Sequence, residues 1–527
     1  MESVFAAVNS ILAFIGPVSD FFWEFPANFA WYRNIPVLGN FSLAIIVLVG
    51  SGIYFSIRLK FIQVTYFKES LQLLVARRTA HTGISPLAAF LLSSAMRVGP
   101  GNIIGVTGAI TVGGPGALFW MWISGFFGMA TAYMESVLAQ IFKEKKGSEF
   151  VGGLPFYSRR LLGNRAWVGI TVSFVYIMYA MFCLPAQGFN VVSSVGAMGE
   201  ILTGAQIPTQ SSFYYITAAA VVFIAALMAF GGIRRVSHAS NAMVPFMAVV
   251  YVVTALVLIF SNTDSLPYFF HAVFYGAFHP EAIFGGLFGT ALVQGVKRGL
   301  MVNEAGQGTI TMAAAAADAK HPCEQGLIAS LGVMMDTHII CTMTGFIVVM
   351  AHNWDTNPAW MEAGKLPKFL LSVDELTPMG YNDIVTFMIT LCFCLFAYTT
   401  MVGMISYSEI AANRVSRSRL FINGVRSFGV FVSAFGILCN IAGYDLGNLW
   451  AFSDLGNIII VYVNVPMLYL GARYVLRATQ HYKATGGADF TSDVIGISCP
   501  YWDKKISAVN DIQDRRHAGA VSPVDAE

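Results

Sequence analysis

The chain has 527 residues, of which 56% are hydrophobic and only 11% are Asp, Glu, Lys or Arg, and its net charge is +2. Soluble proteins carry about 25% charged residues, and a soluble chain of this length divides into domains with polar surfaces. The composition therefore excludes a soluble protein. It predicts an all-α polytopic membrane protein whose surroundings are the lipid bilayer, with no nucleic-acid partner.

Residues 1–35 lack the basic region of a secretory signal. We expect them to form an interfacial segment with Phe22 and Trp23 near the lipid headgroups. A helix needs about 20 apolar residues to cross the hydrocarbon core. With glycine, proline and charged clusters as boundaries, the rest of the sequence predicts about eleven spans. They cover residues 36–58, 85–112, 115–142, 167–203, 213–231, 236–261, 282–301, 326–352, 381–412, 421–443 and 446–472.

The basic residues predict the orientation. Most of the 31 Lys and Arg residues fall on the side of the loop at 58–84, and Lys297, Arg298 and Lys320 are assigned to that side. Only Arg33, Lys365 and Lys368 are assigned to the other side. Because cytoplasmic loops are enriched in Lys and Arg, we expect the N-terminus outside and the C-terminus in the cytoplasm of a prokaryotic inner membrane.

Two predicted spans carry glycine clusters. The second span contains Gly99, Pro100 and Gly101, and the seventh contains Gly285, Gly286 and Gly289. Glycine and proline are tolerated in membrane helices where other groups satisfy the freed backbone. The alternative is that these glycines only allow helices to pack closely.

The two clusters occupy matching positions if the ten spans after the first divide into five and five. The predicted organisation is then an extra helix at 36–58, inverted repeats at 85–261 and 282–476, and a tail at 477–527. Paired interrupted helices of this kind indicate a substrate site at the membrane midplane. Half-helix N-termini favour a carboxylate, and unwound carbonyl groups hold a cation such as Na⁺. The pattern thus favours an ion-coupled transporter of a small anionic or zwitterionic solute.

Other classes of membrane protein lack support in the sequence. A channel calls for a ring of filter residues, and a solute sensor calls for a sizeable soluble output domain; neither pattern is found. No nucleophile motif, metal-spaced His/Asp cluster or GxxxxGK[ST] loop is present, so neither an enzyme nor an ATP-driven pump is indicated. The C-x-C pair at Cys392 and Cys394 has no histidine near it and is interpreted as core packing. No cofactor is expected beyond a coupling ion.

Three stretches resemble the alanine/glycine:cation symporter family, also called the sodium:alanine symporters. They are RVGPGNIIGVTGAITVGGPGALFWMWISGFFGMATAYMESVLAQ at 97–140, QGVKRGLMVNEAGQG at 294–308 with its continuation to Thr342, and LFAYTTMVGMISYSE at 395–409. The resemblance implies the inverted-repeat fold of the leucine transporter with one extra helix. It also implies uptake of alanine or glycine driven by Na⁺, or occasionally by H⁺.

The resemblance assigns roles to residues that match the family's motifs. The residues expected to bind substrate are Gly99, Gly101, Asn102, Gln187, Gly286, Gly289 and Met404. Sodium is expected at the hydroxyl groups of Thr399 and Thr400, with backbone carbonyl groups of Met96 and Gly99. The alternative for the two threonines is a hydrogen bond to the preceding helical turn.

Two departures bear on the cargo. Pro100 stands where the family usually has threonine, and Met404 stands where it usually has tryptophan. A flexible methionine suggests a roomier pocket, so serine or glutamine becomes an option beside alanine and glycine. The sequence therefore predicts a sodium-coupled symporter that imports a small neutral amino acid by alternating access. The alternatives are an H⁺-coupled amino-acid transporter or, less favoured, a solute channel or sensor.

Ionisable residues within spans are functional candidates. Arg97 is expected to pair with Glu135 or Asp336, and Asp336 alternatively to bind the cation. Arg298 and Glu304 are expected together at a cytoplasmic helix end, as an inner gate or as a static cap.

Overall fold

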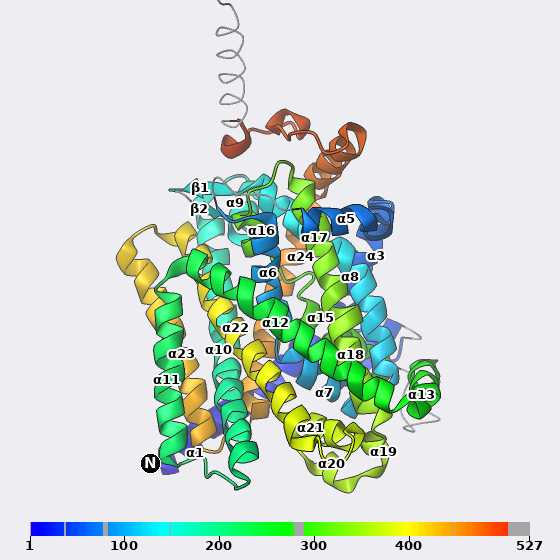
Figure 1. Cartoon of the computed structure of the whole chain (residues 1–527). Coiled ribbons are helices and arrows are strands. Elements are labelled where there is room, and N and C mark those ends of the chain that lie inside the picture. Colours follow the sequence, from blue (N-terminus) through cyan, green and yellow to red (C-terminus); the bar gives the residue numbers. More distant parts are fainter. Residues whose placement is uncertain are drawn as a thin grey trace, which may run out of the picture.

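The structure is a computed structural model that describes residues 2–35, 38–76, 83–147, 149–278, 289–444 and 446–503. Within these ranges the chain is nearly all helical (Figure 1). Strands β1 (Glu144–Lys146) and β2 (Glu149–Val151) form one antiparallel hairpin, with Lys145 opposite Phe150.

The helices of the first half are α1 (Glu2–Glu24), α2 (Ala30–Arg33), η1 (Leu38–Asn40), α3 (Leu43–Arg58), α4 (Ile62–Thr65), α5 (Phe67–Val75), α6 (Pro86–Arg97), η2 (Gly101–Gly105), α7 (Val106–Gly113), α8 (Gly116–Ile141), α9 (Leu154–Leu161), α10 (Ala166–Thr203), α11 (Ser212–Ala229), α12 (Gly232–Ser261), η3 (Thr263–Ser265) and α13 (Leu266–Phe278). Those of the second half are α15 (Gly289–Asn303), α16 (Thr311–Ala316), α17 (Pro322–Met334), η4 (Met335–Ile340), α18 (Cys341–Met350), α19 (Asn353–Thr356), α20 (Pro358–Glu362), α21 (Lys365–Leu376), α22 (Asn382–Val415), α23 (Arg419–Ile441), α24 (Leu446–Thr485) and η5 (Ser492–Val494).

The predicted fold class is confirmed. In the described ranges, eight helices are long and apolar enough to cross a membrane, or nine if α6 and the η2–α7 helix count as one span bent by 50°. The shorter helices α3 and α15 occupy the two remaining predicted spans. Local signals explain several helix starts: the hydroxyl of Ser42 accepts a hydrogen bond from the Ile45 N–H, and Ser85 caps α6 ahead of Pro86.

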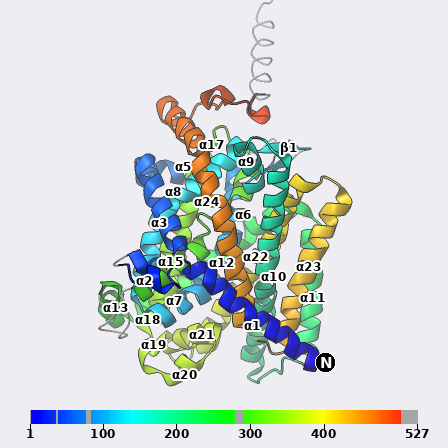
Figure 2. The same cartoon turned by 180° about the vertical axis from the view of Figure 1, so that it is seen from behind.

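The helices pack in two groups. In one group α8 packs against α15 and α17, and in the other α10 packs against α22, α23 and α24. Helix α6 packs against α17 of the first group. Helix α12 connects the groups because it contacts both α6 and α22. The β1–β2 hairpin, α9 and the chain after α24 lie at one end of the bundle, here called the C-terminal face (Figures 1 and 2). Helices α13, α19, α20 and α21 lie at the other end, here called the opposite face.

The first break lies where the sequence predicts it. Helix α6 ends at Arg97, and after Gly99 and Pro100 the chain continues as the π-helical turn η2. A second π-helical turn, η4, lies against η2 from the other half.

In the described residues, the second break lies further along the chain than the glycine cluster from which the sequence predicts it. Helix α15 begins at Gly289 and continues unbroken to Asn303, and the interruption follows at residues 304–310, before α16. Gly306 and Gly308 there have φ of 90° and 74°, and Glu304 has φ of 59°. These left-handed conformations end the helix and are favoured by glycine. Gly286 lies outside the described residues.

Both ends of the chain pack more tightly than the sequence predicts. Trp23 is 3% exposed, and its indole N–H donates to the Asp454 carbonyl on α24, so it does not lie free at the headgroups. Helix α24 continues to Thr485, and the chain after it buries four apolar side chains on the C-terminal face. They are Phe490, Ile495, Cys499 and Trp502.

Candidate functional site

A cavity of about 60 Å³ lies between the two breaks. Water occupies about 10–15 Å³ on this measure, so the cavity holds a solute of only a few heavy atoms. It brings together ten residues that the sequence singles out: Met96, Arg97, Gly99, Pro100, Gly101, Gln187, Arg298, Glu304, Thr400 and Met404. Asn102, Glu135, Asp336 and Thr399 lie outside its lining.

Gln187 presents a polar atom to the cavity. It lies two residues after Pro185 in α10, and its side chain is 3% exposed. In the described part of the chain its Oε1 has no hydrogen-bond partner. A buried amide oxygen without a partner costs about 1–3 kcal/mol. A ligand N–H group would remove that cost.

The two adjacent threonines of α22 differ in direction. Thr400 Oγ1 donates to the Phe396 carbonyl at 2.8 Å and lies 3.3 Å and 3.5 Å from the carbonyl oxygens of Ala95 and Met96, at the end of α6. A Cβ added to Gly99 would lie 2.8 Å from this hydroxyl. The Thr399 hydroxyl also donates to the preceding turn, at Leu395 (2.9 Å), but it lies near Met247 on α12 and contacts no carbonyl group of α6 among the described residues. Hydroxyl and carbonyl oxygens meeting at a helix break suit a monovalent cation.

Asn102 closes the first break from within. Its side-chain oxygen accepts from the Gly99 N–H at 2.9 Å, and its Nδ2 donates to Asp336 Oδ1 at 2.6 Å. The Thr344 hydroxyl donates to the Asn102 carbonyl at 2.8 Å. The bond to Asp336 joins η2 to η4, the bond from Thr344 joins η2 to α18, and Asn102 is fully buried. The residue thus supports the break, in contrast to the direct substrate contact that the resemblance implies.

Arg97 is 2% exposed and forms no direct ion pair with Glu135 or Asp336 within the described ranges, contrary to expectation. Its Nη1 donates to the Ala329 carbonyl at 3.3 Å, while Nε and Nη2 have no partner among described residues. The carboxyl groups of Glu304, Asp336 and Glu135 lie near enough to interact with the charge of Arg97. A Cβ on Gly332 would lie 2.0 Å from Nη1. The guanidinium therefore occupies space that only glycine leaves open.

Glu135 supports the second break from α8. Its Oε1 accepts from the Gly308 N–H at 3.0 Å and from the side-chain amide of Asn464. The same amide donates to the Gly306 carbonyl at 2.9 Å. The buried carboxylate therefore satisfies backbone groups that the interrupted helix frees.

Arg298 and Glu304, expected together at a cytoplasmic helix end, both line the central cavity but form no ion pair with each other in the described residues. Because α15 approaches the break from the opposite face, Arg298 lines a vestibule of about 610 Å³ together with Lys365 and Lys368. It pairs with Asp454 at 3.3 Å, and Lys297 also lies near that carboxylate, so both cations belong with the opposite face. Glu304 lies at the break itself and accepts from the Thr309 hydroxyl at 2.7 Å.

The vestibule and the cavity share a boundary. Gly105, Arg298 and Trp450 line both spaces, so the cavity is approached from the opposite face. On this boundary the Arg298–Asp454 pair joins α15 to α24.

Sequence reasoning missed Asp454 and Asn464. Both lie in the last predicted span, at 446–472. The rule that singles out ionisable residues within spans also applies to Asp454. No comparable signal marks Asn464, because its partner Glu135 is far away in the sequence.

Comparisons with known proteins agree with this architecture. Residues 30–494 match the sodium:alanine symporter family. A Bacillus subtilis protein named "Probable sodium/glutamine symporter" is 33% identical over 488 residues, 89% of this chain and 95% of its own length. The sodium/alanine symporter of Methanococcus maripaludis is 33% identical over 380 residues, 71% of this chain and 81% of its own length. The structure of MhsT in complex with L-phenylalanine has a TM-score of 0.56 at 11% identity and covers 76% of this chain and 93% of that chain, a likeness of fold alone.

Proposed function

We propose that this chain, which belongs to the sodium:alanine symporter family, carries a small neutral amino acid together with Na⁺ through its central cavity. The family implies amino-acid symport; the cargo and the coupling ion are the parts proposed here. One observation carries the proposal. Both interrupted helices meet at one small cavity. Its lining also includes Thr400 and Gln187, whose amide oxygen has no hydrogen-bond partner among the described residues.

The cavity suits a zwitterion. The half-helix that begins at Gly101 would direct its positive dipole end toward the carboxylate of the bound amino acid. Arg97 lines the same cavity, and its Nε and Nη2 have no hydrogen-bond partner in the described chain. The Gln187 oxygen would accept from the ammonium group. The volume of about 60 Å³ favours glycine- or alanine-sized cargo. Met404 and Met301 in the wall are flexible side chains that allow a larger neutral residue to enter.

The cation would bind between Thr400 and the end of α6. There a hydroxyl lies within 3.5 Å of two carbonyl oxygens. Binding at this point would link α22 to the broken helix beside the substrate. Occupation of one site would therefore favour the other, as coupled transport requires.

We also propose that the C-terminal face lies in the cytoplasm of a prokaryotic cell. Lys145, Lys146, Arg159 and Arg160 lie at this face, in keeping with the enrichment of basic residues in cytoplasmic loops. With this orientation the vestibule opens outward, and transport along an inward Na⁺ gradient is uptake.

The test is uptake of labelled glycine, alanine, serine and glutamine into proteoliposomes that contain the full-length protein. We expect uptake of at least one of them under an inward Na⁺ gradient and none when K⁺ replaces Na⁺. Equal uptake in the two salts would refute sodium coupling. Absence of uptake of all four would refute the proposed cargo.

Proton coupling is a second candidate, favoured by one observation. Glu304 places a carboxyl group, which is able to carry a proton, in the cavity wall. Uptake driven by a pH gradient without Na⁺, and abolished by Glu304→Gln, would establish this alternative.

A further inference from the structure

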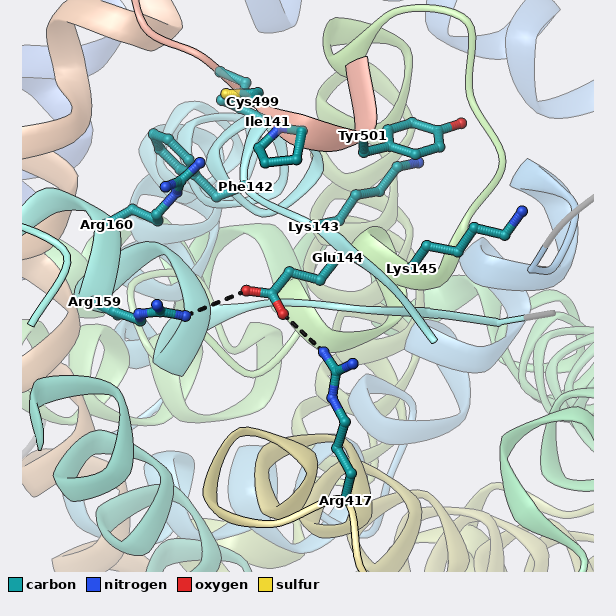
Figure 3. Close-up of a pocket in the computed structure, with 11 residues that line it drawn as sticks. Ile141, Phe142, Lys143, Glu144, Lys145, Arg159, Arg160, Arg417, Cys499 and Tyr501 are labelled. Carbon is teal, nitrogen blue, oxygen red and sulfur yellow. Dashed lines mark hydrogen bonds and ion pairs between the residues drawn. The ribbon is translucent and has the colours of Figure 1, made fainter. Parts of the chain in front are cut away.

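The C-terminal face contains a cavity that the transport function does not use. Its volume is about 580 Å³, and it lies between the end of α8, the β1 strand, α9, the turn after α22 and the chain near Tyr501. Five cationic side chains and one carboxylate line it (Figure 3). They are Lys143, Lys145, Arg159, Arg160, Arg417 and Glu144.

Glu144 arranges the guanidinium groups. It lies 3.0 Å from Arg417 and 3.6 Å from Arg159, which reach it from two sides (Figure 3). One carboxylate cannot neutralise the five cations around it. The buried Nε of Arg159 has no hydrogen-bond partner in the described chain. The cavity therefore has an excess of positive charge and is lined by guanidinium groups, which suit phosphate oxygens.

The wall opposite Glu144 is built from residues 499–501 (Figure 3). Arg160 donates to the Ser498 carbonyl at 3.0 Å. Lys143 lies over the rings of Phe150 (4.1 Å) and Tyr501 (4.7 Å), and the indole N–H of Trp502 donates to the Gln140 carbonyl at 3.1 Å. These contacts hold the segment in place, so the cavity is a formed part of the fold.

An apolar groove begins at the same turn. Ser416 and Ser418, on either side of Arg417, line a groove of about 660 Å³ between α10 and α23. Its other walls are mainly apolar side chains, among them Ile177, Leu420 and Phe428. At 1.5 Å per residue, the groove follows α23 for about 13 Å from its first turn to Phe428. Positive charge at the face and an apolar track leading into the membrane match the two parts of an anionic phospholipid.

We propose that the basic cavity and the groove form a binding site for an anionic phospholipid, with the phosphate headgroup among Lys145, Arg159 and Arg417 and an acyl chain along α23. A bound headgroup would contact α9, β1 and the turn after α22 at once.

The test is titration of phosphatidylglycerol, phosphatidylcholine or inorganic phosphate into the lipid-depleted full-length protein, with binding followed by native mass spectrometry and thermal shift. We expect phosphatidylglycerol to bind at least about tenfold more tightly than phosphatidylcholine. Lys145→Gln and Arg417→Gln should each weaken its binding about fivefold, from the worth of one basic residue near an anionic lipid. Both side chains are exposed, so the variants are expected to fold.

Two controls test whether the anion binds in this cavity and whether it is a lipid headgroup or a free anion. Arg419→Gln changes a basic residue at the same face that does not line the cavity, and it should leave binding unchanged. Leu420→Ser with Phe428→Ser should weaken binding of phosphatidylglycerol and not of inorganic phosphate. Equal binding of the two lipids, or an equal loss in the Arg419 variant, would overturn the proposal. If inorganic phosphate binds and the groove variant leaves phosphatidylglycerol binding unchanged, the lipid proposal is overturned and the ligand is a free anion. These readouts are independent of transport.

Discussion

Thr400→Val tests the proposed cation site most directly, because valine keeps the shape of threonine and removes only the hydroxyl oxygen. That oxygen lies 3.3 Å from the Ala95 carbonyl oxygen and 3.5 Å from that of Met96. An interaction between a polar group and a charge is worth about 1.5–3 kcal/mol. Since 1.4 kcal/mol corresponds to a factor of ten, the half-saturating Na⁺ concentration should rise about 10- to 100-fold.

The neighbouring residue supplies a matched control. The Thr399 hydroxyl bonds to its own helix at Leu395 and contacts no carbonyl group of α6 among the described residues, so Thr399→Val should change the Na⁺ dependence about twofold or less. Both variants are measured by amino-acid uptake into proteoliposomes over a series of Na⁺ concentrations at constant ionic strength. A larger effect at Thr399 than at Thr400, or no effect at Thr400, would refute the assignment of the cation site.

Four further outcomes are expected. Met404→Trp fills part of the cavity wall and should restrict uptake to glycine and alanine; competition by serine and glutamine at wild-type strength would contradict this. Asn102→Ala removes the side-chain hydrogen bonds to the Gly99 N–H and to Asp336 Oδ1 and should destabilise the protein by about 2–4 kcal/mol, seen as a lower unfolding temperature in detergent. Arg426→Gln removes a partly buried bidentate pair with Glu409 (2.6 and 3.0 Å) and should cost up to about 3 kcal/mol, the lower end of the range for a buried pair; a double variant that also changes Glu409 should cost less than the sum of the single changes. Burial and the neighbouring His481 lower the pKa of His321 to about 3. Neutral His321 therefore stabilises the fold fully above pH 6.5 and loses that contribution as the pH falls toward 3. His321→Asn should flatten the acid side of the stability profile, and an unchanged profile would rule this residue out as its cause.

Hydropathy was sufficient for the fold class because membrane spans are long and apolar along the sequence itself. The first break was also predictable, since Gly99, Pro100 and Gly101 form a local signal. The interruption at 304–310 was not predicted, because the glycines at 285–289 resemble the local signal of the first break more closely. The actual interruption includes Glu304, a residue with a side chain in the left-handed region, and such conformations are uncommon outside glycine.

The roles of individual polar residues were harder to predict. Gln187, Thr400 and Met404 line the cavity as placed by resemblance, whereas Asn102 turns to Asp336 on another helix. That partner is distant in sequence, and local spacing contains no information about it. The environment of Arg298 was equally hard to predict. A charge in the middle of a span lies toward one face or the other according to the direction of its helix, and the local sequence does not specify that direction.

The two π-helical turns have a consequence for insertions and deletions. A π-turn accommodates one residue more than the α-helix around it. Removal of a single residue from Met335–Ile340 would restore regular winding there, and the helical segments on either side would keep nearly the same facing, because the wide turn absorbs its extra residue locally. Within the turn the side chains would shift around the helix surface, and Asp336 would change its position relative to Asn102 although the composition of the helix would hardly change. A change of length at this turn is therefore expected to act on the contact between Asn102 and Asp336 and to leave the rest of the span in place.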